Sequence, residues 1–226
     1  MEVSVNNVTK QFMRKSKNSN VFEALKETNL TMQSGKLYEI MGRSGSGKST
    51  LLNIIGGLLT PTGGSVVIDG LDIYQLDDSE LSAFRGENIG VIPQMQTGLA
   101  SLNVYENIVL PLEIYGLKDE AGYAYELMEK FDIAHLKEVM ISELSGGEMR
   151  RMAIARALIR KPKVLLADEP TSDLDDENTQ IVLSYLQEAA KTGIIVLLVT
   201  HESEALKYAD EIYRMSGGVL TKETVV

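Results

Sequence analysis

Cysteine is absent from the 226-residue chain, which excludes disulfide bridges and thiolate chemistry. Long apolar runs are absent too. The longest, Ile194–Val199, is far shorter than the roughly 20 residues that a membrane-spanning helix needs. Residues 1–9 have neither a basic start nor an apolar stretch, so we expect no secretory signal peptide. We therefore expect the chain to reach a membrane only through a partner.

Positive charge is scarce, because 22 Lys and Arg residues stand against 32 Asp and Glu residues, a net charge of −10. Nucleic acids and anionic lipid headgroups are negative, so the chain as a whole does not attract them. We expect no nucleic-acid partner. A phosphate ligand would have to be bound by backbone N–H groups and a few well-placed cations.

Short apolar segments alternate with helical patterns, which predicts an α/β fold with a mixed, mainly parallel sheet. Residues 3–8 and 28–33 alternate apolar and polar side chains, as half-exposed antiparallel strands do. Residues 89–92, 164–167 and 194–199 are continuous apolar blocks, as in parallel strands covered on both faces. The polar and basic residues 13–20 predict a hairpin tip or loop.

Helical spacing dominates residues 102–144, with a break expected at Pro111, and this predicts a helical insertion between two core strands. A further amphipathic helix is expected after Asp175 or Asp176 as its N-cap. The expected organisation is a single domain over residues 1–226. Its core with an N-terminal β subdomain comprises about 1–95 and 160–226, and its helical subdomain comprises about 96–159.

The segment Gly42–Ser49 reads GRSGSGKS and matches the phosphate-binding pattern G-x-x-x-x-G-K-[ST]. It follows an apolar strand expected at 37–41 and opens a helix, which favours a phosphate loop over a plain glycine-rich turn. In such a loop, backbone N–H groups and the helix N-terminus face phosphate oxygens. Lys48 then supplies a cation for the β- and γ-phosphates, and the Ser49 hydroxyl is a ligand for Mg²⁺.

Two carboxylates, Asp168 and Glu169, follow the apolar strand expected at 164–167. Alone, such a pair is more often two solvated acids at a strand end. Beside a phosphate loop the two acids have separate tasks, because Asp168 is placed to hold the Mg²⁺ shell and Glu169 to polarise an attacking water. The sequence therefore predicts chemistry on a nucleoside triphosphate, and at this point kinases, GTPases, helicases and motors all remain open.

A second glycine-rich helix start, Leu144-Ser145-Gly146-Gly147-Glu148, precedes this strand. With this segment the chain resembles the ABC ATPases, whose motif reads LSGGQ, and the resemblance extends from about Val3 to Gly218. The family has a P-loop NTPase core, an antiparallel β subdomain and an inserted α-helical subdomain. The resemblance implies a head-to-tail homodimer with composite ATP sites, in which Ser145 of one copy covers the γ-phosphate held by Lys48 of the other.

The resemblance also assigns roles to single residues. Gln94 matches the Q-loop, which reaches the metal and the attacking water, and residues 172–175 match the D-loop, which contacts the opposite subunit. His201 matches a histidine that contacts the γ-phosphate, and Phe12 lies where an aromatic ring stacks on adenine. The implied catalytic residues are Lys48, Gln94, Glu169 and His201, and the implied metal ligands are Ser49, Gln94 and Asp168. The implied nucleotide-binding residues are Phe12, Gly42, Ser44, Gly45, Ser46, Gly47, Lys48, Ser49, Thr50, Ser145, Gly146, Gly147, Glu148 and Asp175.

Glu148 departs from the family pattern, because it replaces a glutamine and puts negative charge near the expected phosphate site. Residues 41–58 and 104–112 are similar to the macrolide-export and lipoprotein-release branch, which also includes peptide-antibiotic resistance transporters. The resemblance implies an ATPase at the cytoplasmic face of the plasma membrane. It would power a separate transmembrane permease, docked near residues 94–107, for export or extraction of a lipophilic, peptide or antibiotic substrate. The alternative is an ATPase of a mechanotransmission, signalling or cell-division complex that transports nothing.

Overall fold

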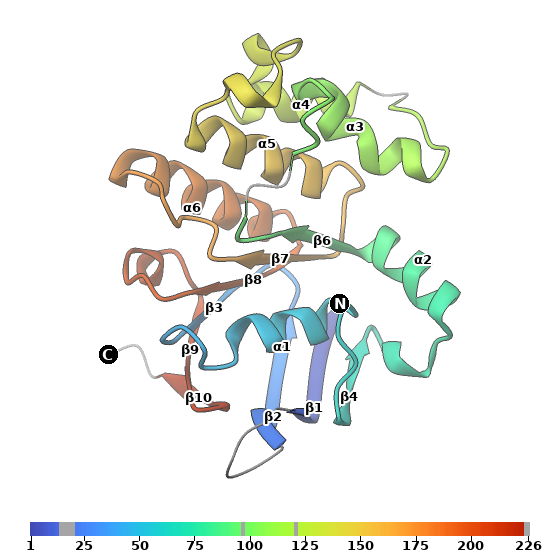
Figure 1. Ribbon diagram of the computed structural model, residues 1–226, viewed down its shortest axis with the longest axis vertical. Helices are drawn as coiled ribbons and strands as arrows, with labels where there is room; N and C mark the ends of the chain where they lie inside the picture. The colour runs from blue at the N-terminus through green and yellow to red at the C-terminus, as the bar shows by residue number, and fades with distance from the viewer. Residues whose placement is uncertain (14–20, 96–97, 120–121, 224–226) are drawn as a thin grey trace.

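Two β-sheets organise the computed structural model, which describes residues 1–13, 21–95, 98–119 and 122–223 (Figure 1). In the six-stranded sheet the order is β10-β9-β3-β8-β7-β6, and every neighbouring pair is parallel except β9 and β10. Its strands are β3 (Leu37–Met41), β6 (Ile89–Ile92), β7 (Val164–Asp168), β8 (Ile195–Thr200), β9 (Glu211–Ser216) and β10 (Val219–Glu223). The predicted α/β class with a mainly parallel sheet is confirmed.

The second sheet is antiparallel and has the order β2-β1-β4-β5. Its strands are β1 (Glu2–Met13), β2 (Val21–Gln33), β4 (Gly63–Ile68) and β5 (Leu71–Asp72). One apolar core joins it to β3, β7, β8 and the helix α1, and includes Val3, Leu25, Ile40 and Leu51. The predicted antiparallel β subdomain is therefore present, and most of the loop expected at 13–20 lies outside the described residues.

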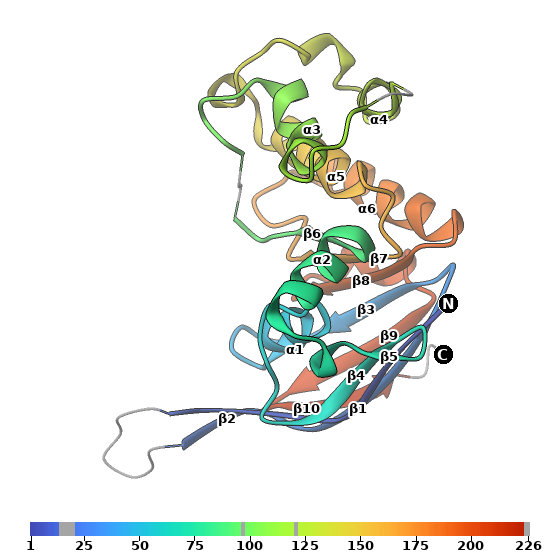
Figure 2. The same cartoon turned by 90° about the vertical axis from the view of Figure 1, so that its right-hand side faces the viewer.

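The helices divide into those that cover the large sheet and those that gather beyond its β6 edge. Figures 1 and 2 show α3, α4 and α5 together at one end of the molecule, above α6 and the sheet. The α-helices are α1 (Lys48–Ile55), α2 (Asp78–Asn88), α3 (Val104–Ile114), α4 (Tyr123–Lys130), α5 (Gly146–Leu158) and α6 (Asp176–Lys191). The short 3-10 helices are η1 (Ile73–Gln75), η2 (Ala134–Leu136), η3 (Ile141–Glu143) and η4 (Glu204–Lys207). No helix within the described ranges is long and apolar enough to cross a membrane.

The break expected at Pro111 is wrong, because α3 continues through this residue to Ile114. A proline inside a helix removes one hydrogen bond, but the apolar face of α3 is buried at Val104, Ile108 and Leu112. Burial of these side chains outweighs the lost bond. The N-cap of α6 is Asp175 and not Asp176, since its side chain accepts a hydrogen bond from the Asn178 N–H.

One buried acid in β3 has no polar partner. Glu39 is 0% exposed, and neither of its carboxylate oxygens has a hydrogen-bond partner among the described residues. It lies opposite Leu198 of β8 and Ile212 of β9. Burial, and then the charge of Glu223, raises the pKa of Glu39 to about 8.

We predict that Glu39 makes the protein less stable as the pH rises from about 4.5 to about 8. The folded state keeps a proton on Glu39 that the unfolded chain loses, so its stability is full below pH 4.5 and falls toward pH 8. The loss is at most about 1.4 kcal/mol per pH unit. Urea unfolding at several pH values should show this slope in the parent and not in Glu39→Gln, which keeps the shape but does not titrate. The exposed Glu87→Gln is the control, and equal slopes in the parent and Glu39→Gln would contradict the prediction.

Candidate nucleotide site

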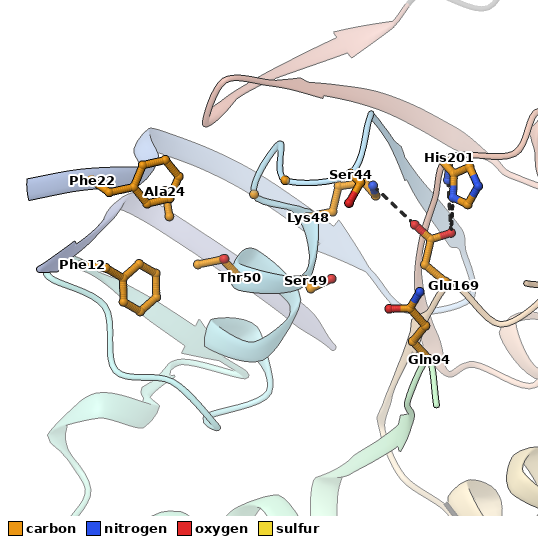
Figure 3. A pocket seen from close by; sticks show the side chains of 12 residues that line it. Phe12, Phe22, Ala24, Ser44, Lys48, Ser49, Thr50, Gln94, Glu169 and His201 are labelled. Carbon is orange, nitrogen blue, oxygen red and sulfur yellow. Dashed lines mark hydrogen bonds and ion pairs between the residues drawn. The ribbon is translucent and has the colours of Figure 1, made fainter. Parts of the chain in front are cut away.

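The carboxyl ends of four parallel strands deliver the predicted site residues to one place. The loop 42–47 follows β3, Gln94 follows β6, Glu169 follows β7, and His201 follows β8. Ligands of open α/β sheets bind at this edge. A cavity of about 380 Å³ opens there (Figure 3). It is lined by Phe12, Phe22, Ala24, Ser44, Gly45, Gly47, Lys48, Ser49, Thr50, Gln94, Glu169 and His201.

The glycine-rich loop turns into α1 at Gly47, whose φ of 114° is in the left-handed region that favours glycine. A Cβ here would lie 2.6 Å from the Ala24 carbonyl oxygen, so no larger residue fits. The first N–H groups of α1 lack acceptors within the helix and are suited to bind an anion. The Ser46 hydroxyl oxygen is buried and has no hydrogen-bond partner in the described part of the chain. The first N–H groups of α1 are therefore the donors that this loop can offer to phosphate oxygens in the cavity.

Three side chains that line the cavity contact one another in the order Lys48, Glu169 and His201. The Lys48 Nζ lies 3.4 Å from Glu169 Oε1, and the other carboxylate oxygen, Oε2, lies 2.8 Å from His201 Nδ1 (Figure 3). Lys48 Nζ also donates to the Gly42 carbonyl oxygen at 2.6 Å. Because an ionised carboxylate can only accept, His201 Nδ1 carries the hydrogen in this contact. Glu169 is thus fixed from both sides.

Beside these residues, Ser49 and Asp168 form the pair that the sequence assigns to a metal. The Ser49 Oγ donates to Asp168 Oδ1 at 3.0 Å. Burial raises the pKa of Asp168, while the hydrogen bond from Ser49 opposes this shift. A hydroxyl and a partly buried carboxylate are the hard oxygen ligands that Mg²⁺ prefers, and a cation would offset the cost of burying the acid. The donor set therefore fits Mg²⁺.

Two phenyl rings, Phe12 and Phe22, line the end of the cavity away from Glu169 (Figure 3). Their Cα atoms are direct partners in the pairing of β1 with β2, and each residue is 39% exposed. Sequence reasoning singled out Phe12 and missed Phe22. The signal was the antiparallel hairpin itself, because the register that pairs Met13 with Val21 places Phe12 opposite Phe22.

The second glycine-rich helix start lies apart from this cavity within one chain. Ser145 is the N-cap of α5, and its N–H and Oγ donate to Glu148 Oε2 at 2.8 and 2.7 Å. These hydrogen bonds lower the pKa of Glu148. The carboxylate of Glu148, which replaces the glutamine of the family motif, is thus hydrogen-bonded to the N-cap residue of its own helix. The predicted residues that do not line the cavity are Ser145, Gly146, Gly147, Glu148, Asp175 and Asp168, together with Gly42 and Ser46, which border a second cavity with residues 214–217.

Arg150 is a positioning residue that sequence reasoning did not identify. It is 3% exposed, and its guanidinium donates to the carbonyl oxygens of Pro93 at 2.8 Å and Gln94 at 3.2 Å. The arginine therefore ties α5 to the segment that carries Gln94 into the cavity. Nothing in the local sequence distinguishes Arg150 from its arginine neighbours, because the contact joins residues far apart in the chain.

The chain is similar to curated ATP-binding proteins. The chain is 40% identical over 228 residues to the methionine import ATP-binding protein MetN of Vibrio vulnificus, covering 99% of this chain but only 65% of that protein. It is 41% identical over 199 residues to the lipoprotein-releasing system ATP-binding protein LolD of Geobacter metallireducens, covering 87% of this chain and 88% of that protein.

The fold has close relatives among solved structures. The dimeric ATP-binding cassette MJ0796, in a post-hydrolysis state bound to ADP and Pi, matches with a TM-score of 0.87 and 34% identity over 99% of this chain and 100% of that one. A family model described as ABC transporter matches residues 25–172. Since this match spans more than half of the chain, the protein belongs to the ABC transporter family.

Proposed function

We propose that the protein is the ATP-binding and ATP-hydrolysing subunit of an ABC transporter. The observation that carries the proposal is the convergence of a phosphate loop, a buried lysine and a fixed carboxylate in one cavity. These are the groups that phosphoryl transfer to water requires.

ATP binding would use both ends of this cavity. The rings of Phe12 and Phe22 offer flat apolar surface to the adenine base. At the other end, Lys48 would exchange its contacts with Gly42 and Glu169 for phosphate oxygens. Ser49 and Asp168 would hold Mg²⁺, which supplies charge neutralisation on the phosphates when bound.

Hydrolysis would depend on Glu169 as the general base. Its carboxylate accepts a proton from water as the water oxygen bonds to the γ-phosphorus, and the bond to the oxygen of ADP breaks. His201 holds one carboxylate oxygen and orients the other toward the cavity. Lys48 and the loop N–H groups stabilise the charge that develops on the phosphate oxygens.

A homodimer would complete the site. Each chain has two anion-binding helix starts, at Lys48 and at Gly146, yet only the first lines the cavity. Head-to-tail pairing brings the Ser145 segment of one copy to the Lys48 cavity of the other, and the same contact repeats by symmetry. The dimeric state of the MJ0796 cassette supports the formation of a dimer.

We predict that Glu169→Gln binds ATP but hydrolyses it at least about a hundredfold more slowly, because an amide cannot accept the proton. The variant should then persist as an ATP-bound dimer, seen by light scattering after size exclusion. The exposed Glu204→Gln, in the segment after β8, is the control and should keep the parent rate. Hydrolysis by Glu169→Gln at the parent rate would refute the assignment of the base.

Loss of either ring should weaken ATP binding. We predict that Phe12→Ala and Phe22→Ala each lose about tenfold in ATP affinity, since stacking of a base on an aromatic ring contributes about 1–3 kcal/mol. Affinity for tripolyphosphate, which has no base, should stay unchanged. Calorimetric titration measures both, with the exposed Met13→Ala on the same strand as control. Equal losses for ATP and tripolyphosphate would contradict a role in binding the base.

The transmembrane partner and the position at the cytoplasmic face of the plasma membrane belong to this proposal as well. Large apolar side chains are exposed on both sides of α3, at Met95, Leu99, Ile114 and Leu117. Exposed apolar groups of this kind mark contact surfaces. Met95 and Leu99 lie within the range 94–107 expected for docking, of which residues 96–97 are outside the described part, and Ile114 and Leu117 lie at the far end of α3. We propose that a permease helix binds here, in a complex that exports or extracts its substrate, as the near full-length match to LolD favours.

We predict that Ile114→Asp combined with Leu117→Asp abolishes co-purification of a polytopic permease from solubilised membranes, while ATP affinity stays at the parent value. Binding would bury the two introduced aspartate carboxylates against the permease, and burial of unpaired charges is costly. Tyr125→Asp on α4, also at an exposed position, is the control. Retention of the permease by the double variant would refute this surface, and the identity of the recovered permease separates a transporter from a non-transporting complex.

A further inference from the structure

Asn178, in the first turn of α6, links the starts of two helices. Its side-chain Oδ1 accepts a hydrogen bond from Arg151 Nη1 of α5 at 3.0 Å. Its Nδ2 donates to both carboxylate oxygens of Asp175, at 2.9 and 3.1 Å, and its backbone N–H donates to Asp175 Oδ1 at 2.8 Å. One amide therefore joins a guanidinium on α5 to the N-cap carboxylate of α6.

The same amide lies directly against the backbone of Gly147. A Cβ at Gly147 would lie 2.2 Å from Asn178 Oδ1, so only glycine permits this approach. Gly147 belongs to the helix start that begins with the N-cap Ser145. Figure 1 shows α5 and α6 as neighbouring helices, and the two are in contact. Asn178 on the neighbouring helix therefore packs against the Ser145 helix start.

Asp175, which Asn178 contacts, is connected along the chain to Glu169, the proposed general base. Asp175 is the last residue of the segment 171–175. The first two residues of this segment form hydrogen bonds near the nucleotide site. Ser172 Oγ donates to the Glu169 carbonyl oxygen at 3.0 Å, and Thr171 Oγ1 donates to Glu202 at 2.6 Å. A short segment with hydrogen bonds at both ends therefore separates Glu169 from the Asn178 amide.

We infer that Asn178 is a positioning residue that sets the distance between the Ser145 helix start and Glu169 of the same chain. The inference rests on the proposed dimeric ATPase. In a symmetric head-to-tail pair, each helix start has to reach the partner's phosphate site while each base reaches its own water. Both contacts form together only if the spacing within each chain is fixed.

The chemistry of the link requires an amide. Asp175 is an acceptor and Arg151 is a donor, so the residue between them must donate on one side and accept on the other. An aspartate at position 178 would keep the bond to Arg151 but face the Asp175 carboxylate with like charge. Exchange of the two side chains restores the match, because an asparagine at position 175 could donate to an aspartate at position 178. Asparagine also caps a helix as well as aspartate does.

The test compares Asn178→Asp with the exchanged pair, in which Asp175→Asn is combined with Asn178→Asp. We expect Asn178→Asp to lower kcat about tenfold or more while KM changes less than about twofold, and the exchanged pair to recover most of kcat. In a Glu169→Gln background, Asn178→Asp should raise the ATP concentration needed for dimer formation by a similar factor, and the exchange should reverse this. Gln180→Ala, exposed on the same helix, is the control.

The outcomes separate this inference from the function on which it rests. A parent protein without ATPase activity or ATP-driven dimers would overturn the proposed function. An active parent with kcat unchanged in Asn178→Asp, or an exchanged pair no better than Asn178→Asp, would overturn the positioning role alone. Lost thermal stability with unchanged kcat, measured where every variant is folded, would also overturn it, because the contact would then serve only folding.

Discussion

The buried contact between Lys48 and Glu169 is the interaction on which the rest of the site depends. Lys48 is 5% exposed and Glu169 is 7% exposed, so neither charge is hydrated well enough to remain alone. Removal of one member of such a pair typically costs about 3–5 kcal/mol, because the other charge stays buried without a partner. In this structure each charge is offset by the other, and His201 is a second partner for Glu169.

The order of the sheet is what makes this pairing available. β8 lies between β3 and β7, so the phosphate loop and the acidic strand end flank the strand that carries His201. The backbone at Glu169 has a φ of 46°, an unfavourable conformation for a side-chain-bearing residue. Its N–H donates to the Val199 carbonyl oxygen of β8 at 2.9 Å, which holds this conformation in place. The carboxylate of this strained residue contacts both the lysine and the histidine.

Much of this arrangement could be predicted from the sequence, because its signals are local. A continuous apolar block followed by Asp168 and Glu169 predicts a buried parallel strand that ends at a candidate active site. The segment 42–49 matches the phosphate-loop pattern by itself. Phe22 and Arg150 escaped prediction for a different reason. Phe22 enters the site through strand register, and Arg150 through a contact with a backbone carbonyl 56 residues away.

Pro111 is a position where a local sequence rule predicts a feature that the structure does not have. Local rules predict a break, yet the helix persists, since packing of its buried face decides the outcome and packing partners are not visible in a local pattern. The roles of individual site residues stay predictions, because they concern contacts with a nucleotide. The subdomain boundaries stay predictions as well, because they concern motion of one subdomain relative to the other.

The capping box at the start of α5 explains how an acid can stand beside an expected phosphate contact. Glu148 accepts hydrogen bonds from the Ser145 N–H and hydroxyl, so its charge is already satisfied by donors of its own helix start. A phosphate approaching Ser145 would compete with Glu148 for that hydroxyl, while the N–H groups of Gly146 and Gly147 in the first turn have no such rival within the helix. In a dimer, the backbone of this segment would therefore carry more of the contact than the serine hydroxyl, and the rigidity of the backbone at Gly147 would matter more than the identity of residue 148.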